Sequence, residues 1–115
     1  MDDVIDCTRL YWVDGVIATG PTMERSCLKG YSPAQLQKIG SGGISGRGIG
    51  ERSLKAVSYL RAHAGKSLLI VGAGGIITPA DARRMLDAGA NLIQIYSSFI
   101  YEGPGIVKKM IQEIK

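Results

Sequence analysis

Clusters of glycine and small polar residues occur at three places in this sequence, and their backbone amides could hold an anion. The clusters are residues 19–22, residues 72–76 and residues 96–98, and a further glycine-rich stretch lies at residues 40–47. Glycine has no side chain, so the N–H groups of glycine-rich turns can come close to a phosphate or a carboxylate. A single cluster of this kind is more often only a tight turn, but three clusters that meet at one place favour anion binding.

The cluster at residues 72–76 has some likeness to the glycine fingerprint of dinucleotide-binding proteins. However, Ile77 occupies the place of the third glycine, and the next apolar run ends in Tyr96 rather than in an acidic residue. In dinucleotide-binding proteins an acidic residue at that point binds the ribose. The dinucleotide interpretation is therefore weak.

Side chains that could act in catalysis or bind a metal are few. Cys7 and Cys27 are not spaced like zinc ligands, and His63 is the one histidine, so we expect no metal site. His63 falls near the end of a predicted helix, where a solvated imidazole fits better than a proton shuttle. Arg47 follows a glycine cluster, and the sequence leaves open whether it binds an anion or is simply exposed.

Three short apolar runs, at residues 15–19, 68–72 and 92–96, are expected to position the clusters. Each run is continuous rather than alternating, which is typical of parallel strands covered on both faces. Small residues follow each run, so these turns fall at the carboxyl edge of the sheet, where loops converge on ligands. The sequence therefore predicts an α/β protein with an anion site at this edge.

Helices are predicted around these strands. Residues 52–64 carry apolar side chains at three-residue spacing, and residues 78–89 begin with a threonine cap and a proline and end at a glycine. An apolar stripe over residues 106–114 predicts a final helix that packs on the sheet. Residues 4–12 and residues 97–101 are candidates for two further helices.

The repeated order of strand and helix fits two architectures, an open doubly wound sheet or a part of a (β/α)8 barrel. The barrel explains an anion site better, because phosphate in such barrels commonly lies between the last loops and a short extra helix. The connection at residues 23–51 is long enough to be either functional or disordered. Tyr11 and Trp12, which precede the first strand, are expected to pack against a neighbouring element.

The composition is that of one globular unit, with 115 residues of which 45% are hydrophobic and 21% charged. The net charge of +4 is spread without a basic run, so nucleic-acid binding is not indicated. No stretch approaches the roughly 20 apolar residues of a membrane span. The acidic start at residues 1–3 is unlike a secretory or transit peptide, so we expect a cytoplasmic protein with reduced cysteines.

Five segments together resemble dihydroorotate dehydrogenase, most closely its quinone-linked class. They occur in the family's order, cover nearly the whole chain, and are residues 14–19, 24–26, 42–47, 71–76 and 94–104. The resemblance implies a partial TIM (β/α)8 barrel of about three βα units, as one C-terminal FMN-phosphate-binding segment over residues 1–115. It also implies a flavoprotein oxidoreductase that oxidises dihydroorotate to orotate in pyrimidine biosynthesis. Dihydrouridine synthases and inosinate dehydrogenases resemble these segments less well.

The resemblance assigns six residues to binding of the cofactor FMN. Thr19 and Gly46 are similar to the residues of the family that contact the flavin. Gly75, Tyr96 and Ser97 resemble the residues whose backbone holds the FMN phosphate, and Gly74 belongs to the same glycine turn. The interpretation from glycine chemistry alone pointed to the same kind of anion.

Two departures from the family affect the expected activity. Gly20 and Pro21 stand where the family has an Asn-Thr pair that binds the pyrimidine substrate, so the substrate-binding residues are unassigned. Each unpaired polar group of a substrate costs about 1–3 kcal/mol, so dihydroorotate should bind poorly or another ligand should be preferred. The family's catalytic base lies upstream of the matched region, and Ser26 and Cys27 do not match its position. No catalytic residue is therefore assigned.

The length of the chain predicts an incomplete sheet. A barrel of this type needs about 250 residues and eight strands, and only about three strands are predicted here. Open sheet edges recruit other strands, so we expect a homo-oligomer or assembly with a complementary N-terminal barrel chain. Two functions stay open: a truncated part of a flavin oxidoreductase that is inactive alone, or a non-catalytic module or remnant that binds phosphate or FMN.

Overall fold

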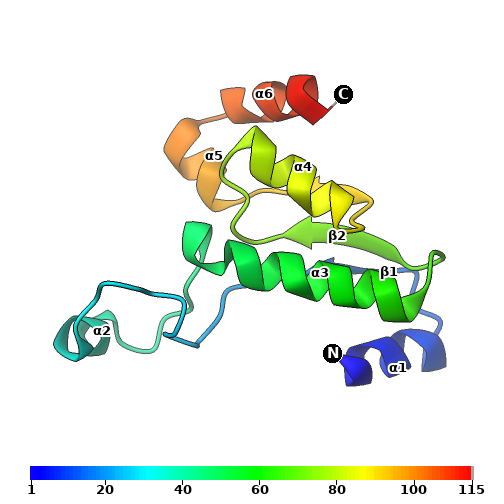
Figure 1. The fold of residues 1–115 in the computed structure, drawn as a ribbon, viewed down its shortest axis with the longest axis horizontal. Helices are drawn as coiled ribbons and strands as arrows, with labels where there is room; N and C mark the ends of the chain where they lie inside the picture. Colours follow the sequence, from blue (N-terminus) through cyan, green and yellow to red (C-terminus); the bar gives the residue numbers. More distant parts are fainter. Residues whose placement is uncertain (115) are drawn as a thin grey trace.

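Three parallel strands form a small sheet at the centre of the chain (Figure 1). The strands, in their order across the sheet, are β1 (Gly15–Ala18), β2 (Leu69–Ala73) and β3 (Leu92–Gln94). The structure is a computed structural model, and it describes residues 1–114. Val71 lies opposite Ile17 on one side and Leu92 on the other, so these three residues share one face. The three predicted strands are confirmed, and β1 and β3 are the open edges of the sheet within residues 1–114.

Helices connect and flank the strands. They are α1 (Asp2–Leu10), α2 (Pro33–Ile39), the 3-10 helix η1 (Gly46–Ile49), α3 (Gly50–Ala64), α4 (Pro79–Asp87), α5 (Ser97–Glu102) and α6 (Gly105–Ile114). The helices expected near residues 4–12, 52–64, 78–89, 97–101 and 106–114 are therefore confirmed. None of the helices described over residues 1–114 is long and apolar enough to cross a membrane.

Helices cover only one face of the sheet. Side chains on the covered face are buried, as for Ile70 at 0% and Ala18 at 5% exposure. On the opposite face Ile17 is 65% exposed and Leu92 is 57% exposed. The prediction that the strands are covered on both faces is therefore wrong for this chain. Apolar residues on both faces of the strands predicted that both faces are covered, but residues 1–114 supply helices for only one face.

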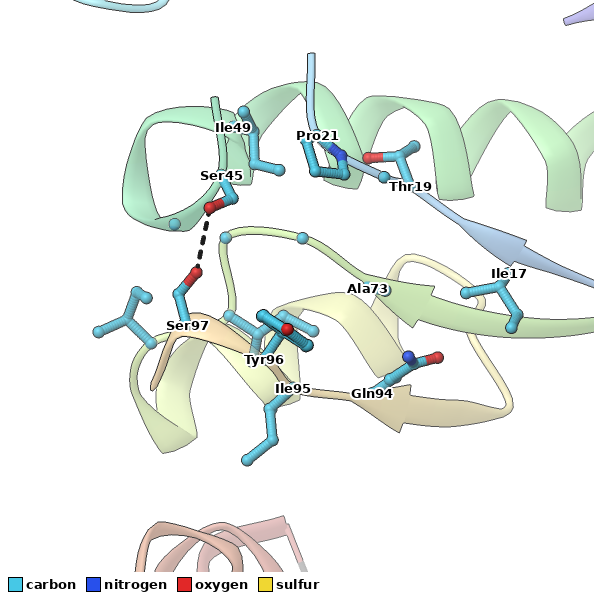
Figure 2. Close-up of a pocket in the computed structure, with 16 residues that line it drawn as sticks. Ile17, Thr19, Pro21, Ser45, Ile49, Ala73, Gln94, Ile95, Tyr96 and Ser97 are labelled. Atoms are coloured by element: carbon cyan, nitrogen blue, oxygen red, sulfur yellow. Dashed lines mark hydrogen bonds between the residues drawn. The ribbon is translucent and has the colours of Figure 1, made fainter. Parts of the chain in front are cut away.

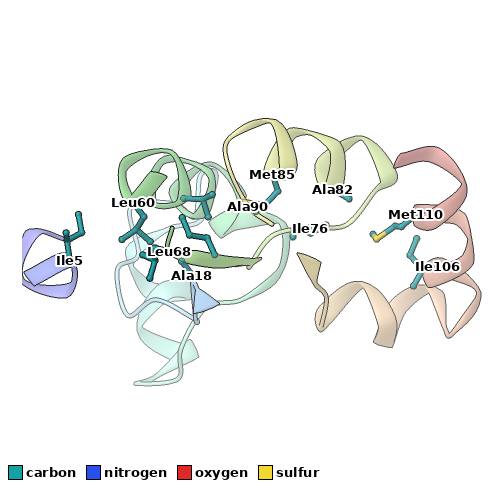
Figure 3. Packing of buried hydrophobic residues seen from close by; sticks show 12 residues of the cluster. Ile5, Ala18, Leu60, Leu68, Ile76, Ala82, Met85, Ala90, Ile106 and Met110 are labelled. Carbon is teal, nitrogen blue, oxygen red and sulfur yellow. The ribbon is translucent and has the colours of Figure 1, made fainter. Parts of the chain in front are cut away.

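Most of the core lies between the sheet and the helices that cover it, and Ile106 and Met110 continue it between α6 and α4 (Figure 3). Leu60 of α3 packs there, and so does Met85 of α4. Gly72 of β2 allows the close approach of α4, because a Cβ at this position would overlap the side chain of Met85. Ile5 of α1 extends the layer beyond β1.

The final helix lies elsewhere than predicted. Instead of packing on the sheet, α6 packs mainly on α4 and α5, with Ile106 and Met110 buried. An apolar hollow of about 390 Å³ separates α6 from β3. The stripe on α6 is wider than the surface that α4 and α5 offer, so Val107 and Ile111 stay exposed at 41% and 47%.

Two further expectations before and after β1 need correction. Trp12 is 89% exposed and Tyr11 is 70% exposed, so neither is covered by another element of residues 1–114. The connection at residues 23–51 is not a continuous loop, because α2 projects from it away from the sheet (Figure 1). The side chain of Ser32 accepts a hydrogen bond from the Gln35 N–H at 3.3 Å, and the Ser32 N–H donates to the Gln35 side chain at 2.8 Å. This reciprocal cap fixes the start of α2.

The cap of α4 contains a titrating group. The Asp81 carboxylate accepts hydrogen bonds from the N–H groups of Ile77 and Thr78, at 3.1 and 2.9 Å. Partial burial acts to raise the pKa of Asp81, but hydrogen bonds from Thr78 and Ile77 and the charge of Arg47 outweigh it. The pKa of Asp81 is therefore lower in the folded chain than its usual value of 3.8.

We expect the cap to stabilise the chain at neutral pH and to lose this effect in acid. With a lowered folded pKa, the contribution is fully present above the unfolded pKa and disappears as the pH falls through the folded pKa. Asp81→Asn should therefore lower stability by about 1 kcal/mol at pH 7 and by much less near pH ~2. Thermal melting at both pH values measures this difference. Asp87→Asn, in the last turn of the same helix, is the control and should destabilise at neither pH.

Candidate functional site

A cavity of about 560 Å³ lies at the carboxyl ends of the three strands (Figure 2). It is lined by Ile17, Thr19, Gly20, Pro21, Ser45, Gly46, Ile49, Ala73, Gly74, Gly75, Ile76, Ile77, Gln94, Ile95, Tyr96 and Ser97. All six residues that the sequence assigned to a cofactor site are in this lining. The predicted convergence of the three clusters on one sheet edge is therefore confirmed, and the binding of a cofactor by these residues stays a prediction.

The turn after β2 exposes backbone to the cavity and permits no side chain. Gly74 and Gly75 both have positive φ, at 96° and 75°. A Cβ on Gly74 would lie 2.5 Å from the Ser53 Oγ, and a Cβ on Gly75 would overlap the backbone of Gly50. Left-handed backbone and close packing both require glycine here. The turn can therefore present amide groups, and these are fixed in place by the start of α3.

The glycine-rich stretch of residues 40–47 and the cluster of residues 96–98 meet across the mouth of the cavity. Ser97 donates a hydrogen bond from its Oγ to the Ser45 Oγ at 3.3 Å, as Figure 2 shows. Gly46 has a φ of 80°, and a Cβ there would point toward the Ser97 side chain with 3.8 Å to its Oγ. The start of η1 and the start of α5 therefore face each other over a gap that the missing side chain of Gly46 leaves open.

Thr19 closes the cavity at the end of β1. Its N–H donates to the Ala73 carbonyl at 2.7 Å, which continues the pairing of β1 with β2 for one residue. Its hydroxyl Oγ1 lies 2.7 Å from the Ser53 Oγ on α3. The threonine is thus held by the sheet through its backbone and by a helix through its side chain.

The loops that flank the cavity are tied together. Thr22 and Ile44 form an isolated antiparallel bridge, with N–H to O distances of 2.9 and 2.7 Å. Arg25 donates from one guanidinium nitrogen to the carbonyls of Gly40 and Gly42, at 2.6 and 2.8 Å. These contacts hold the glycine loop of residues 40–47 beside the end of β1, which places Gly46 at the cavity.

The chemistry that the cavity can perform is limited. Its lining has hydroxyl groups, one amide at Gln94 and backbone groups, but no carboxylate, imidazole, amine or thiol. The hydroxyl groups of Thr19, Ser45, Tyr96 and Ser97 have none of those groups beside them in the lining to activate them as bases. Arg47 does not line this cavity; it is exposed and borders a smaller hollow on the other side of the Gly74 and Gly75 turn. Residues 1–114 therefore supply binding groups at this site and no general base.

Sequence reasoning missed several residues of this site. Ser53 was not singled out, although it is fully buried and shares the buried face of α3 with Val57 and Leu60. A serine on an otherwise apolar helical stripe was the available signal. The sequence places Ser45 only within a glycine-rich stretch and Gln94 only within a strand. Their roles depend on which face of each strand or turn meets the cavity.

Comparisons with known proteins agree with this geometry. The family model described as dihydroorotate dehydrogenase matches residues 2–115. The chain is 39% identical over 114 residues to a dihydroorotate dehydrogenase (quinone) of Aliivibrio salmonicida, covering 99% of this chain and 33% of that protein. It is 42% identical over 112 residues to one of Nocardioides sp., covering 96% of this chain and 31% of the other.

Solved structures give the same result. The ligand-free DHODH of Eimeria tenella superposes with a TM-score of 0.85 at 32% identity, covering 97% of this chain and 30% of that one. The complex of the same enzyme with ferulenol gives a TM-score of 0.83. The chain thus spans about a third of the length of the curated relatives that it matches. Its three βα units match part of the TIM barrel of these solved structures. It belongs to the dihydroorotate dehydrogenase family.

Proposed function

We propose that this chain contributes the phosphate-holding part of an FMN site in a dihydroorotate dehydrogenase-like flavoprotein, which oxidises dihydroorotate to orotate in pyrimidine biosynthesis. The observation that carries the proposal is the meeting of three turns, at Gly46, Gly75 and Ser97, around one cavity. Separate backbone segments that converge with free amides are suited to a dianionic group. Membership of the family supports the same assignment.

The two ends of the cavity differ in a way that fits FMN. Its volume of about 560 Å³ lies within the roughly 300–1,000 Å³ of small-molecule sites. At one end Ser45 and Ser97 flank the glycine turns, which suits a phosphate (Figure 2). At the other end Ile17 and Gln94 offer an apolar surface with one amide, which suits a polar ring. Bound FMN would supply the hydride-accepting chemistry of a flavin.

We further propose that the chain acts together with a complementary barrel part and is inactive alone. The cavity lacks a general base, so the group that removes a proton from the substrate comes from elsewhere. The open edges of β1 and β3 and the exposed face around Ile17 and Leu92 are suited to pairing with further strands. The alternative, a module that binds FMN or phosphate without catalysis, is favoured by the same lack of a base.

A comparison of FMN with riboflavin tests whether the site binds the phosphate group. FMN should raise the melting temperature of the purified chain and bind with a flavin absorbance band, whereas riboflavin, which lacks the phosphate, should do so at least about tenfold less tightly, a difference of ~1.4 kcal/mol. Inorganic phosphate should compete with FMN. Equal effects of FMN and riboflavin, or no effect of either, would contradict the proposal.

Gly46→Ala tests where the ligand lies. Its added methyl group meets only the Ser97 side chain at ordinary contact distance, so the fold should survive, but the group projects into the gap beside the cavity. We expect about tenfold weaker FMN binding, a loss of ~1.4 kcal/mol. Gly103→Ala is the matched control, because Gly103 has a φ of 74° against 80° for Gly46 and lies outside the cavity lining. FMN affinity should be unchanged in that variant.

A further inference from the structure

Ser53 is a buried hydroxyl group whose position is not explained by the stability of α3. The residue is 0% exposed and lies in the first turn of the helix, on the face that also buries Val57 and Leu60. A buried hydroxyl is costly unless it has a hydrogen-bond partner. Among residues 1–114 its one partner is the Thr19 Oγ1, at 2.7 Å. The contact joins α3 to the wall of the cavity.

The burial of the two hydroxyls determines which of them donates. Each hydroxyl has one proton to donate and two lone pairs to accept. If Thr19 donated, the proton of Ser53 would be left without an acceptor in a fully buried position, which costs free energy. If Ser53 donates, both groups are satisfied, because half-buried Thr19 lines the cavity and can direct its own proton into it. The second arrangement is therefore the stable one.

The backbone of Thr19 cannot rotate to undo this arrangement. Its N–H is bound to the Ala73 carbonyl at 2.7 Å, so the residue is anchored to β2. The hydroxyl of Ser53 is equally restricted, because it packs against the Gly74 Cα, where even a Cβ would come within 2.5 Å. Both partners are therefore held, and the direction of the hydrogen bond is fixed before any ligand arrives.

We propose that Ser53 is a positioning residue that makes Thr19 a hydrogen-bond donor toward the cavity, so that the ligand presents an acceptor at this point. The inference rests on the proposed FMN site, and it specifies a carbonyl oxygen or an unprotonated ring nitrogen of the flavin as the group beside Thr19. Ser53 does not touch the ligand; it acts only through Thr19. A ligand with an N–H group at this position would meet a donor and be disfavoured.

A double-mutant cycle separates this role from simple packing. Ser53→Ala should weaken FMN binding by about threefold to tenfold, and Thr19→Val by at least as much, because each removes the oriented donor. In the Thr19→Val background, Ser53→Ala should have no further effect on FMN affinity. Thr19→Ser keeps the hydroxyl and should retain the affinity. Affinity is measured by titration followed in the flavin absorbance band.

Thr8→Ala is the matched control. Thr8 is also buried, at 8% exposure, its hydroxyl donates to the Ile5 carbonyl at 2.7 Å, and it lies outside the cavity lining. Its removal should leave FMN affinity unchanged. If Ser53→Ala weakens FMN binding equally with and without Thr19, or does not weaken it at all, the positioning role is wrong.

Thermal melting of the ligand-free chain is an independent test of the coupling between Ser53 and Thr19. The same cycle should show coupling in melting temperature, with Ser53→Ala costing about 4–8 °C in the wild-type background and clearly less beside Thr19→Val. If the chain binds no FMN but the coupling is present, the proposed function fails and the Ser53–Thr19 arrangement stands. Additive melting shifts would overturn the inference itself.

Discussion

Gly75→Ala should destabilise the chain by about 2–6 kcal/mol, the largest effect that we expect from any single methyl group in it. Gly75 has a φ of 75°, which costs a residue with a side chain about 1–3 kcal/mol. Its Cβ would also overlap the N and Cα of Gly50, at the junction of η1 and α3. Backbone atoms at a helix start cannot move aside as a flexible side chain does, so the collision adds about 1–3 kcal/mol.

Gly103→Ala isolates the collision from the backbone strain. Gly103 has almost the same φ, 74°, but no atom within 4 Å of an added Cβ. It should therefore show only the strain, and urea unfolding of both variants measures the difference. Since a small domain has about 5–15 kcal/mol of stability in total, Gly75→Ala is expected to be largely unfolded or to lose FMN binding. An equal loss of stability in the two variants would mean that the turn at Gly75 moves away from Gly50 without a cost in free energy.

Part of this site could be predicted from the sequence. Continuous apolar runs predicted the strands, and parallel strands place all their following turns at one edge. The convergence of Thr19, Gly46, Gly75 and Ser97 on one cavity follows from that topology and from the glycine loop. The roles carried over from the family rested on the same residues.

Other features depend on contacts that a local pattern does not contain. Helix α2 buries none of its residues, so no apolar stripe reveals it, and its sequence signals are the Ser32 and Gln35 cap, Pro33 at its start and Gly40 after its end. Trp12 looks like a core residue by type, but no element of residues 1–114 covers it. The partner of Ser53 is 34 residues away, and only the packing of α3 on β1 brings them together.

Catalytic activity should appear only when this chain is combined with a complementary barrel part. We expect the chain alone to oxidise no dihydroorotate, because its cavity has no general base. Co-expression with the part of a quinone-type relative that precedes the matched region should give a complex with measurable turnover. The driving force is burial of the open sheet face, where Ile17 and Leu92 are 65% and 57% exposed, together with pairing of the β1 and β3 edges.

A charge on the open face should prevent this assembly. Leu92→Lys places an ammonium group where the complementary part must pack, and it should reduce complex formation and turnover by at least about tenfold, since burial of one leucine is worth about 1.5–3 kcal/mol. The exposure of Leu92 means that the isolated chain should melt unchanged. Ile39→Lys on α2, which is 44% exposed and remote from the sheet, is the control and should assemble normally.

The two proposed functions, a part of an oxidoreductase and a non-catalytic binding module, give opposite results in this experiment. A complex that forms and binds FMN but shows no turnover favours a non-catalytic module, for which Gly20 and Pro21 at the cavity offer a reason, since neither provides a polar side chain for a substrate. Turnover by the chain alone would mean that a base outside the cavity lining reaches the substrate. Turnover that requires both parts, and that disappears with Leu92→Lys but not with Ile39→Lys, supports assembly across the open face of the sheet.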